Sequence, residues 1–413
     1  MRRGGFGLLR RAFRSVVGGG FAAKLRRRAL LFRPLCRLLA RFAQRRPVEP
    51  GKVVFASLSG GVSCNPKYIA MELLRRRGDL DVVWLVEGGT AASGLSRGVR
   101  TAPLWSLRAL REMATAKVLV ENAQQMFLFN AAPKRGGQVY LNTWHGSLGI
   151  KRLSTASRRI RETAARLSSA VDAVLTNSTF EEGVFAESFF PGTRMLRLGH
   201  ARNDVFFWPE EGKSRLRARV RGAAGLAEGE RLALYAPTFR EAAFFTDAGG
   251  LRFCEWARAF ADRFGGVWKI AVRLHPHDAR GLAEGLFSLP PDVLDLSSYD
   301  DVQELLVAAD ACVTDYSSLI FDYLLGGRPG FVFAPDKAKY DEGRGFCYPL
   351  EETPFPIAES EDALCANVRA FDAVRYAARR EEFLKARGCM EDGHAARRAA
   401  DLIEKVLSGG EVE

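Results

Sequence analysis

One histidine stands where a substrate hydroxyl could be deprotonated. His145 lies between Trp144 and Gly146, and a glycine lets a substrate approach the backbone closely. An unperturbed histidine has a pKa of about 6.5, close to working pH, so His145 is a candidate general base. Its position alone indicates a hydrogen-bonded core histidine equally well.

Two further histidines lie beside arginines that could bind an anion. His275 follows Arg273 in the sequence Arg-Leu-His-Pro, and the two side chains together offer positive donors to a phosphate. His200 opens a turn-like stretch that also contains Arg202, a second candidate for contact with an anion.

A pair of serines precedes a short apolar run that has the length of a helix. Ser317 and Ser318 stand before residues 319–325, and glycines end the run. A serine at a helix start caps free backbone N–H groups, and the same groups also hold phosphate. A plain helix cap is the alternative, but Asp315 just before the pair favours a phosphate site.

The pattern gives no sign of a metal or a bound cofactor. Asp79 and Asp81 have a DxD spacing, but they precede a strand and therefore fall on the wrong edge of a sheet. No cysteine and histidine set has zinc spacing, and neither a P-loop nor a GxGxxG motif follows the first strand. Arginine and histidine would therefore have to balance the charge of a bound phosphate.

Two series of buried strands alternating with helices predict an α/β protein with two doubly wound domains. Ligands of such sheets bind beyond the carboxyl ends of the strands, where the polar clusters fall, including Thr238 and Arg240. We expect domains at 49–210 and 211–392, with a junction near 210–230 and a C-terminal helix and tail at 393–413. The strands are expected at 52–57, 81–86, 117–120, 138–142, 173–176, 231–236, 269–274, 311–314 and 330–334, and helices at 67–77, 157–169 and 393–407.

The basic charge of the chain is confined to its first 48 residues. They contain fourteen Lys or Arg and no acid, so the net charge of +13 leaves about −1 for the remainder. Phenylalanines and leucines interleave with these arginines, which is typical of an amphipathic segment on an anionic membrane surface. A disordered basic tail, a transit peptide and a nucleic-acid arm are alternatives, although no basic patch continues into the body. Seven scattered cysteines indicate a reducing compartment, and therefore the cytoplasmic face of the membrane.

The ordered set of motifs resembles the CDP-glycerol glycerophosphotransferases of teichoic acid and capsule synthesis, which include polyol-phosphate polymerases and primases. Each motif alone is weak, but the ordered set is specific and spans roughly residues 51–400. The motifs are Thr143-Trp144-His145-Gly146, Arg202-Asn203-Asp204, Tyr235-Ala236-Pro237-Thr238-Phe239-Arg240, Arg273-Leu274-His275-Pro276, Ala309-Asp310, Thr314-Asp315-Tyr316-Ser317-Ser318, Asp322, Arg328-Pro329 and Arg344-Gly345-Phe346.

The resemblance implies a GT-B-type fold with two Rossmann-like domains facing a cleft, and peripheral attachment to the membrane. It implies transfer of glycerol phosphate or ribitol phosphate from a CDP-linked donor to a lipid-linked or polymer acceptor, with release of CMP. His145 would act as the base and His275 would serve the donor phosphates. The other donor contacts would come from Arg273, Ser317, Ser318, Thr238, Arg240 and Asp315, and candidate acceptor or phosphate contacts are Gly146, Lys151, Arg202 and Arg344.

Two departures from the family's usual pattern leave the acceptor open. Residues 147–151 replace the usual Thr-Pro-Leu-Lys after Trp-His-Gly, and residues 199–201 replace Gly-Asn-Pro. Two other functions stay open on the sequence: a nucleotide-sugar glycosyltransferase of the same fold, and a non-enzymatic membrane-surface or nucleic-acid binder.

Overall fold

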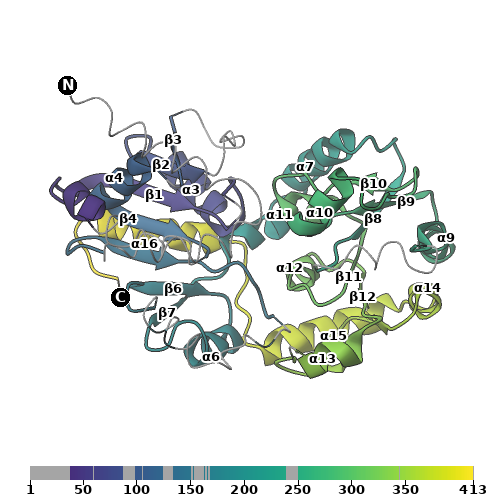
Figure 1. The fold of residues 1–413 in the computed structure, drawn as a ribbon. Helices are drawn as coiled ribbons and strands as arrows, with labels where there is room; N and C mark the ends of the chain where they lie inside the picture. The colour runs from purple at the N-terminus through teal and green to yellow at the C-terminus, as the bar shows by residue number, and fades with distance from the viewer. Residues whose placement is uncertain are drawn as a thin grey trace.

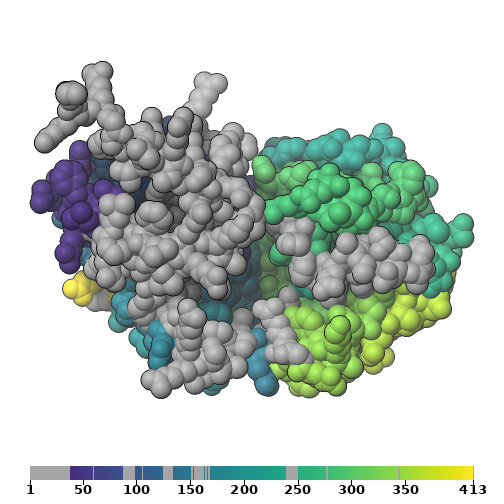
Figure 2. All heavy atoms as spheres, viewed as in Figure 1, coloured from purple at the N-terminus to yellow at the C-terminus, as the bar shows by residue number. Residues whose placement is uncertain are grey.

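The chain folds into two lobes, each built on a parallel sheet (Figure 1). The computed structural model describes residues 38–58, 60–86, 98–104, 106–123, 134–149, 168–238, 250–343 and 345–412, together with residues 152, 162 and 165. The lobes are in contact in the space-filling view (Figure 2). A buried ion pair joins them, in which Lys67 Nζ lies 2.6 Å from Asp301 Oδ2 and 3.0 Å from Glu304 Oε1.

The first lobe is a seven-stranded parallel sheet in the order β3-β2-β1-β4-β5-β6-β7. Its central strands are almost wholly buried, as their runs of branched apolar residues require when helices cover both faces. The elements are β1 (Glu49–Ala56), α3 (Cys64–Arg76), β2 (Asp81–Val86), β3 (Arg100–Pro103), α4 (Leu107–Thr115), β4 (Ala116–Glu121), β5 (Val139–Asn142), β6 (Ala173–Thr176), α6 (Thr179–Glu187), β7 (Arg194–Arg197) and η2 (Ala201–Phe207).

The second lobe is a six-stranded parallel sheet in the order β10-β9-β8-β11-β12-β13. The predicted boundary at residue 210 coincides with the first residue of α7, which packs against α11 of this lobe. The elements are α7 (Glu210–Ala223), β8 (Arg231–Tyr235), α9 (Phe253–Phe264), β9 (Trp268–Val272), α10 (Pro276–Ala283), β10 (Leu294–Asp295), α11 (Val302–Ala308), β11 (Ala311–Thr314), α12 (Leu319–Leu325), β12 (Gly330–Phe333), α13 (Lys337–Gly343), η4 (Leu350–Glu352), β13 (Ile357–Ala358), α14 (Glu361–Arg369) and α15 (Ala373–Ala386).

The last helix, which the sequence predicted at 393–407, returns to the first lobe. α16 (Ala395–Leu407) packs against α3 and β4, and lies across the first lobe in Figure 1. Its buried stripe follows a helical period and includes Ala399, Ile403 and Val406. Asp204 accepts hydrogen bonds from the first two amides of the helix, at 2.9 and 2.7 Å, so a buried carboxylate anchors its N-terminus.

Nine strands were predicted and all nine are present, so the α/β class with two doubly wound sheets is confirmed. The ranges 81–86, 173–176 and 311–314 match to the residue. Four strands were missed, namely β3, β7, β10 and β13, and these are the outermost strands of the two sheets.

Two predicted segments fall largely outside the described part of the chain. Of the leader, residues 38–48 are described: residues 38–43 are helical, and Leu38 and Phe42 are exposed. Most of the helix predicted at 157–169 is also outside. No helix among the described residues is long and apolar enough to cross a membrane.

Candidate active site between the two sheets

Polar clusters from both sheets follow the carboxyl ends of their strands, and two of these clusters meet. His145 and Gly146 follow β5, while Ser317 and Ser318 follow β11 and precede α12. A Cβ placed on Gly146 would lie 3.7 Å from Ser318 Oγ, so the two loops face each other at close range. Three of the predicted site residues lie outside the described residues: Lys151, Arg240 and Arg344.

The His145 ring is held in one tautomer. Its Nδ1 lies 2.6 Å from the carbonyl oxygen of Asn122, the residue that follows β4. A carbonyl can only accept, so Nδ1 carries the hydrogen and Nε2 keeps its lone pair. Burial lowers the pKa of His145 from 6.5 to about 4, with Arg202 and His200 adding to the decrease and the Asn122 bond opposing it. The residue as a whole is nevertheless exposed, and its hydrogen bond within the described part of the chain uses Nδ1 rather than Nε2.

The loop that carries His145 has a strained backbone on both sides. Trp144 has a φ of 50° and Leu148 a φ of 40°, a region that residues other than glycine rarely adopt. Packing holds both residues in place. The Trp144 ring stacks on His145 at 4.6 Å and meets Phe190 edge-on at 5.7 Å, and Tyr348 donates to the Leu148 carbonyl. A strained, over-determined loop of this kind is common at functional sites.

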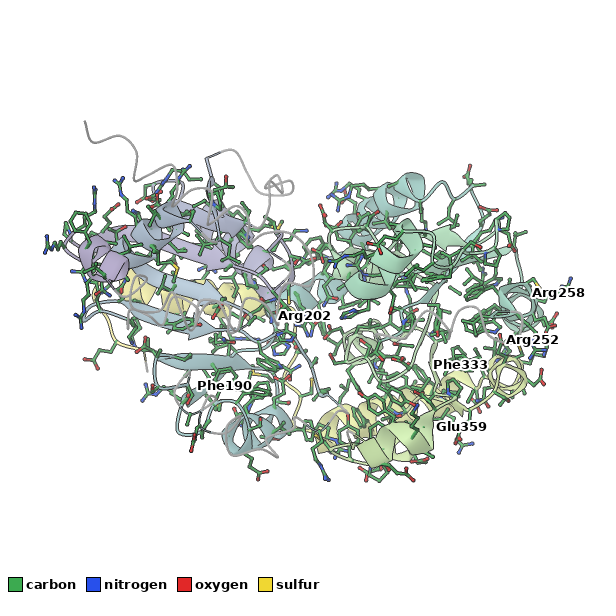
Figure 3. All side chains as sticks on the ribbon, viewed as in Figure 1. Phe190, Arg202, Arg252, Arg258, Phe333 and Glu359 are labelled. Carbon is green, nitrogen blue, oxygen red and sulfur yellow. The ribbon has the colours of Figure 1, made fainter. Side chains whose placement is uncertain are left out.

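Arg202 was predicted as a direct contact for an anion, but its geometry favours a positioning role. It lies between the two lobes (Figure 3) and is 2% exposed. Its Nε lies 3.0 Å from Asp322 Oδ2, and its Nη2 donates to the Gly146 carbonyl at 2.9 Å. Burial alone would lower the pKa of Arg202, but the charges of Asp322 and Cys64 and the hydrogen bonds to both together outweigh burial and raise it. The guanidinium therefore fixes the loop rather than facing an open cleft.

Asp315 and Thr238 bind each other. The Asp315 carboxylate accepts hydrogen bonds from the Thr238 amide at 2.9 Å and from its hydroxyl at 2.8 Å. Asp315 is fully buried, and its bonds to Thr238 hold the loop after β8 in place. The predicted contact of Asp315 with phosphate stays a prediction.

The serine pair is half-buried and its second member does not act as a helix cap. Ser318 occupies the N-cap of α12, yet its side chain makes no capping hydrogen bond. The plain helix-cap interpretation therefore does not explain this serine. Its hydroxyl faces the Gly146 loop, as the short distance between them requires.

Arg273 and His275 have different surroundings in the described structure. Arg273 Nη1 donates to the carbonyls of Leu296 and Tyr299, and burial lowers the pKa of this arginine. His275 is exposed just before α10. The predicted pair therefore divides into an arginine that supports the loop after β10 and a histidine at the surface.

The structure adds three residues that the sequence analysis did not select: Asn122, Asn177 and Glu391. Asn122 and Asn177 follow β4 and β6, so the strand-end rule used for the other clusters could have found them. Glu391 lies between α15 and α16 and had no such signal. Among the described residues no group of three or more His, Cys, Asp or Glu could hold a metal ion.

Comparisons with known proteins agree on one family. Residues 38–405 match the family described as CDP-Glycerol:Poly(glycerophosphate) glycerophosphotransferase. A teichoic acid poly(glycerol phosphate) polymerase of Bacillus subtilis (strain 168) is 26% identical over 81% of this chain, and a teichoic acid ribitol-phosphate primase of Bacillus spizizenii is 27% identical over 73%. The match covers 46% of the polymerase and 78% of the primase, so this chain spans about half the length of the polymerase.

A solved structure shows the same fold over nearly the whole chain. The wall teichoic acid polymerase TagF superimposes with a TM-score of 0.76 at 26% identity, over 93% of this chain and 95% of that one. The two-sheet architecture is therefore shared with a GT-B-like enzyme structure.

Proposed function

Because the chain belongs to the CDP-glycerol:poly(glycerophosphate) glycerophosphotransferase family, we propose that it transfers glycerol phosphate, or a related polyol phosphate, from a CDP-linked donor to an acceptor hydroxyl. The observation that carries the proposal is the meeting of the His145–Gly146 loop with Ser318 across the two sheets. One loop supplies a neutral base, and the other supplies hydroxyl groups at a helix start.

His145 would take the proton of the acceptor hydroxyl on Nε2. The acceptor oxygen then bonds to the β-phosphorus of CDP-glycerol, the bond from that phosphorus to the bridging oxygen breaks, and CMP leaves. The Nδ1–H bond to Asn122 supports this role, because it orients the ring and leaves Nε2 as the basic atom.

The second lobe would bind the donor. Ser317 and Ser318 would donate to its phosphates, with Thr238 held nearby by Asp315 and with His275 exposed at the start of α10. In phosphoryl-type transfers positioning and electrostatics supply most of the catalysis, which suits donors on rigid strand ends. We retain Arg240 as a proposed donor contact, and Lys151 and Arg344 as proposed acceptor or phosphate contacts.

One assay tests which donor the protein uses and how many units it adds to the acceptor. The protein is incubated with CDP-glycerol, CDP-ribitol or a UDP-sugar, each with a short lipid-linked acceptor, and the released nucleotide and the product length are measured. We expect CMP from one of the CDP-linked donors. Release of UDP alone would replace the proposal with a nucleotide-sugar glycosyltransferase. Product length distinguishes a single addition, as in a primase, from polymerisation.

We further propose that residues 1–46 hold the enzyme on an anionic membrane surface, near a lipid-linked or polymer acceptor. Leu38 and Phe42 are exposed, and the fourteen basic residues of the leader are unmatched by acids. Each basic residue contributes up to about 1 kcal/mol near such a surface, and salt screens it. Deleting residues 1–46 should release the protein from anionic vesicles and leave both lobes folded. Equal sedimentation of the shortened protein would move the membrane site into the body, and protection of RNA or DNA by the full chain would point to a nucleic-acid binder.

A further inference from the structure

The partly buried carboxylate of Glu391 connects to the His145 loop by two chains of hydrogen bonds. Glu391 lies on the segment that leads from α15 back to α16. Its Oε1 accepts hydrogen bonds from Asn177 Nδ2 at 3.0 Å and from Asn203 Nδ2 at 2.9 Å, and the His200 amide donates to it at 3.2 Å. One oxygen therefore organises three donors from the first lobe.

The first connection runs through Asn177. An amide nitrogen carries two hydrogens, and Asn177 Nδ2 donates one to Glu391 and the other to Ser147 Oγ at 2.9 Å. Ser147 is the residue after Gly146, two positions from His145. Glu391 thus orients the side-chain amide of Asn177, and that amide in turn holds Ser147.

The second connection runs through Asn203 and reaches the loop one residue earlier. Asn203 Oδ1 accepts from Gln303 Nε2 at 2.9 Å, and Gln303 Nε2 also lies 3.2 Å from Asp322 Oδ2. Asp322 pairs with Arg202, and Arg202 donates to the Gly146 carbonyl. The two connections form a closed ring that begins at Glu391 and ends on adjacent residues of one loop.

This ring explains how a strained loop can keep one geometry. His145 is held by Asn122, Gly146 by Arg202 and Ser147 by Asn177, so each residue depends on a different element. Two of these three supports lead to Glu391. Removing its carboxylate would leave two asparagine amides without their shared acceptor and free both supports at once.

We propose that Glu391 is a positioning residue for the transfer reaction, which acts through Asn177 and Ser147 to hold His145 in its reactive orientation; this rests on the proposed function. Reacting groups displaced by about 1 Å can lose on the order of 10²-fold in rate. Glu391→Ala should therefore lower kcat by roughly 10- to 100-fold, with the KM for the CDP-linked donor nearly unchanged, because the donor-binding serines are not part of the ring.

Two variants separate positioning from general destabilisation. Glu391→Gln keeps a carbonyl oxygen where Oε1 accepts its three bonds, so it should restore kcat to near the wild-type value. Asp392→Ala is the matched control. Asp392 is the adjacent residue and is exposed, and among the described contacts it pairs only with half-buried Arg398 and the His394 amide. This variant should leave kcat unchanged.

A double-mutant cycle tests the connection to the loop. If Glu391 acts through Ser147, then Glu391→Ala and Ser147→Ala combined should lower kcat by little more than the larger single effect. If the two single losses of kcat multiply in the double variant, Glu391 does not act through Ser147. All assays are run well below the melting temperature of each variant, so that loss of folded protein does not contribute.

A readout without substrate keeps the inference separate from the proposed function. In histidine-labelled protein, the Nδ1–H resonance of His145 should be sharp in the wild type and in Glu391→Gln, and broadened or shifted in Glu391→Ala. No CMP release by the wild type would refute the proposed function, while the resonance would still report on positioning. An unchanged His145 resonance in Glu391→Ala would overturn the inference, as would an unchanged kcat.

Discussion

The protonation state of His145 gives a prediction that can be worked out from the structure. A histidine with an ordinary pKa near 6.5 is only about one-quarter neutral at pH 6, whereas one with a pKa of about 4 is almost wholly neutral. A general base works in its neutral form, so the rate is lost as pH falls through the pKa of the base. The acid limb of kcat/KM should therefore lie below about pH 5, and the wild-type rate should be flat from about pH 6 to 8.

Substitution of the same residue gives the size of the effect. His145→Ala should lower kcat by roughly 10²–10⁴-fold, the usual loss when a general base is removed. Donor affinity should change little, because the serines proposed to bind the donor lie on the other lobe. CMP release measured across the pH range, and calorimetry with CDP-glycerol, provide the two readouts. His394→Ala is the control, because His394 is exposed at the start of α16 and has no proposed part in the reaction.

Two results would refute this reasoning. An acid limb centred near pH 6.5 would mean that burial does not lower the pKa of the working base, or that another group is the base. A collapse of CDP-glycerol affinity in His145→Ala, with normal turnover of the donor that still binds, would move His145 from the chemistry to the donor site.

Three further perturbations test other parts of the site. Ser317→Ala combined with Ser318→Ala should weaken CDP-glycerol binding, measured by calorimetry, by about 1–3 kcal/mol for each lost contact. Ser318 makes no side-chain cap, so a lower melting temperature with normal binding would contradict the proposed donor contact. Asp322→Ala leaves the buried charge of Arg202 without its ion-pair partner and should lower the free energy of unfolding, measured in urea, by about 3–5 kcal/mol. A loss below about 1 kcal/mol would show that the pair is dispensable for stability. Burial raises the pKa of Glu391 from 4.5 to about 7, so between these two pH values the folded protein keeps a proton that the unfolded chain loses. The free energy of unfolding should therefore fall by on the order of 3 kcal/mol as the pH rises from 4.5 to about 7. Glu391→Gln should remove that dependence, and equal pH profiles for the two proteins would contradict it.

The strands that the sequence predicted are the ones whose side chains are buried on both faces. β2 and β11 are continuous apolar runs with polar residues at each end, so their limits were predicted to the residue. β3 and β7 are sheet edges that contain arginines, and they lack the apolar run that marks a central strand. The central part of each sheet was therefore predictable, and the edges were not.

The site was predictable only where its residues follow strands. His145 and Ser318 both follow buried strands, so the strand-end rule could select them, and the structure places Gly146, the neighbour of His145, close to Ser318. The partners of a charged group leave no such local pattern. Arg202 was expected to be available to an anion, but Asp322, 120 residues later, pairs with it. Glu391 could not be predicted because its partners come from segments around residues 177 and 200, which are distant in sequence.

The return of α16 to the first lobe has a consequence for how the protein is made. The apolar faces of α3 and η2 that α16 covers are synthesised before the second lobe, whereas α16 itself is synthesised after it. Domains commonly fold as units and in order during synthesis. Here the first lobe has to wait, with part of its core uncovered, until the whole second sheet has been translated. During that interval the second lobe, which is contiguous from α7 to α15, can complete its own sheet first, so the order of folding would be the reverse of the order of translation.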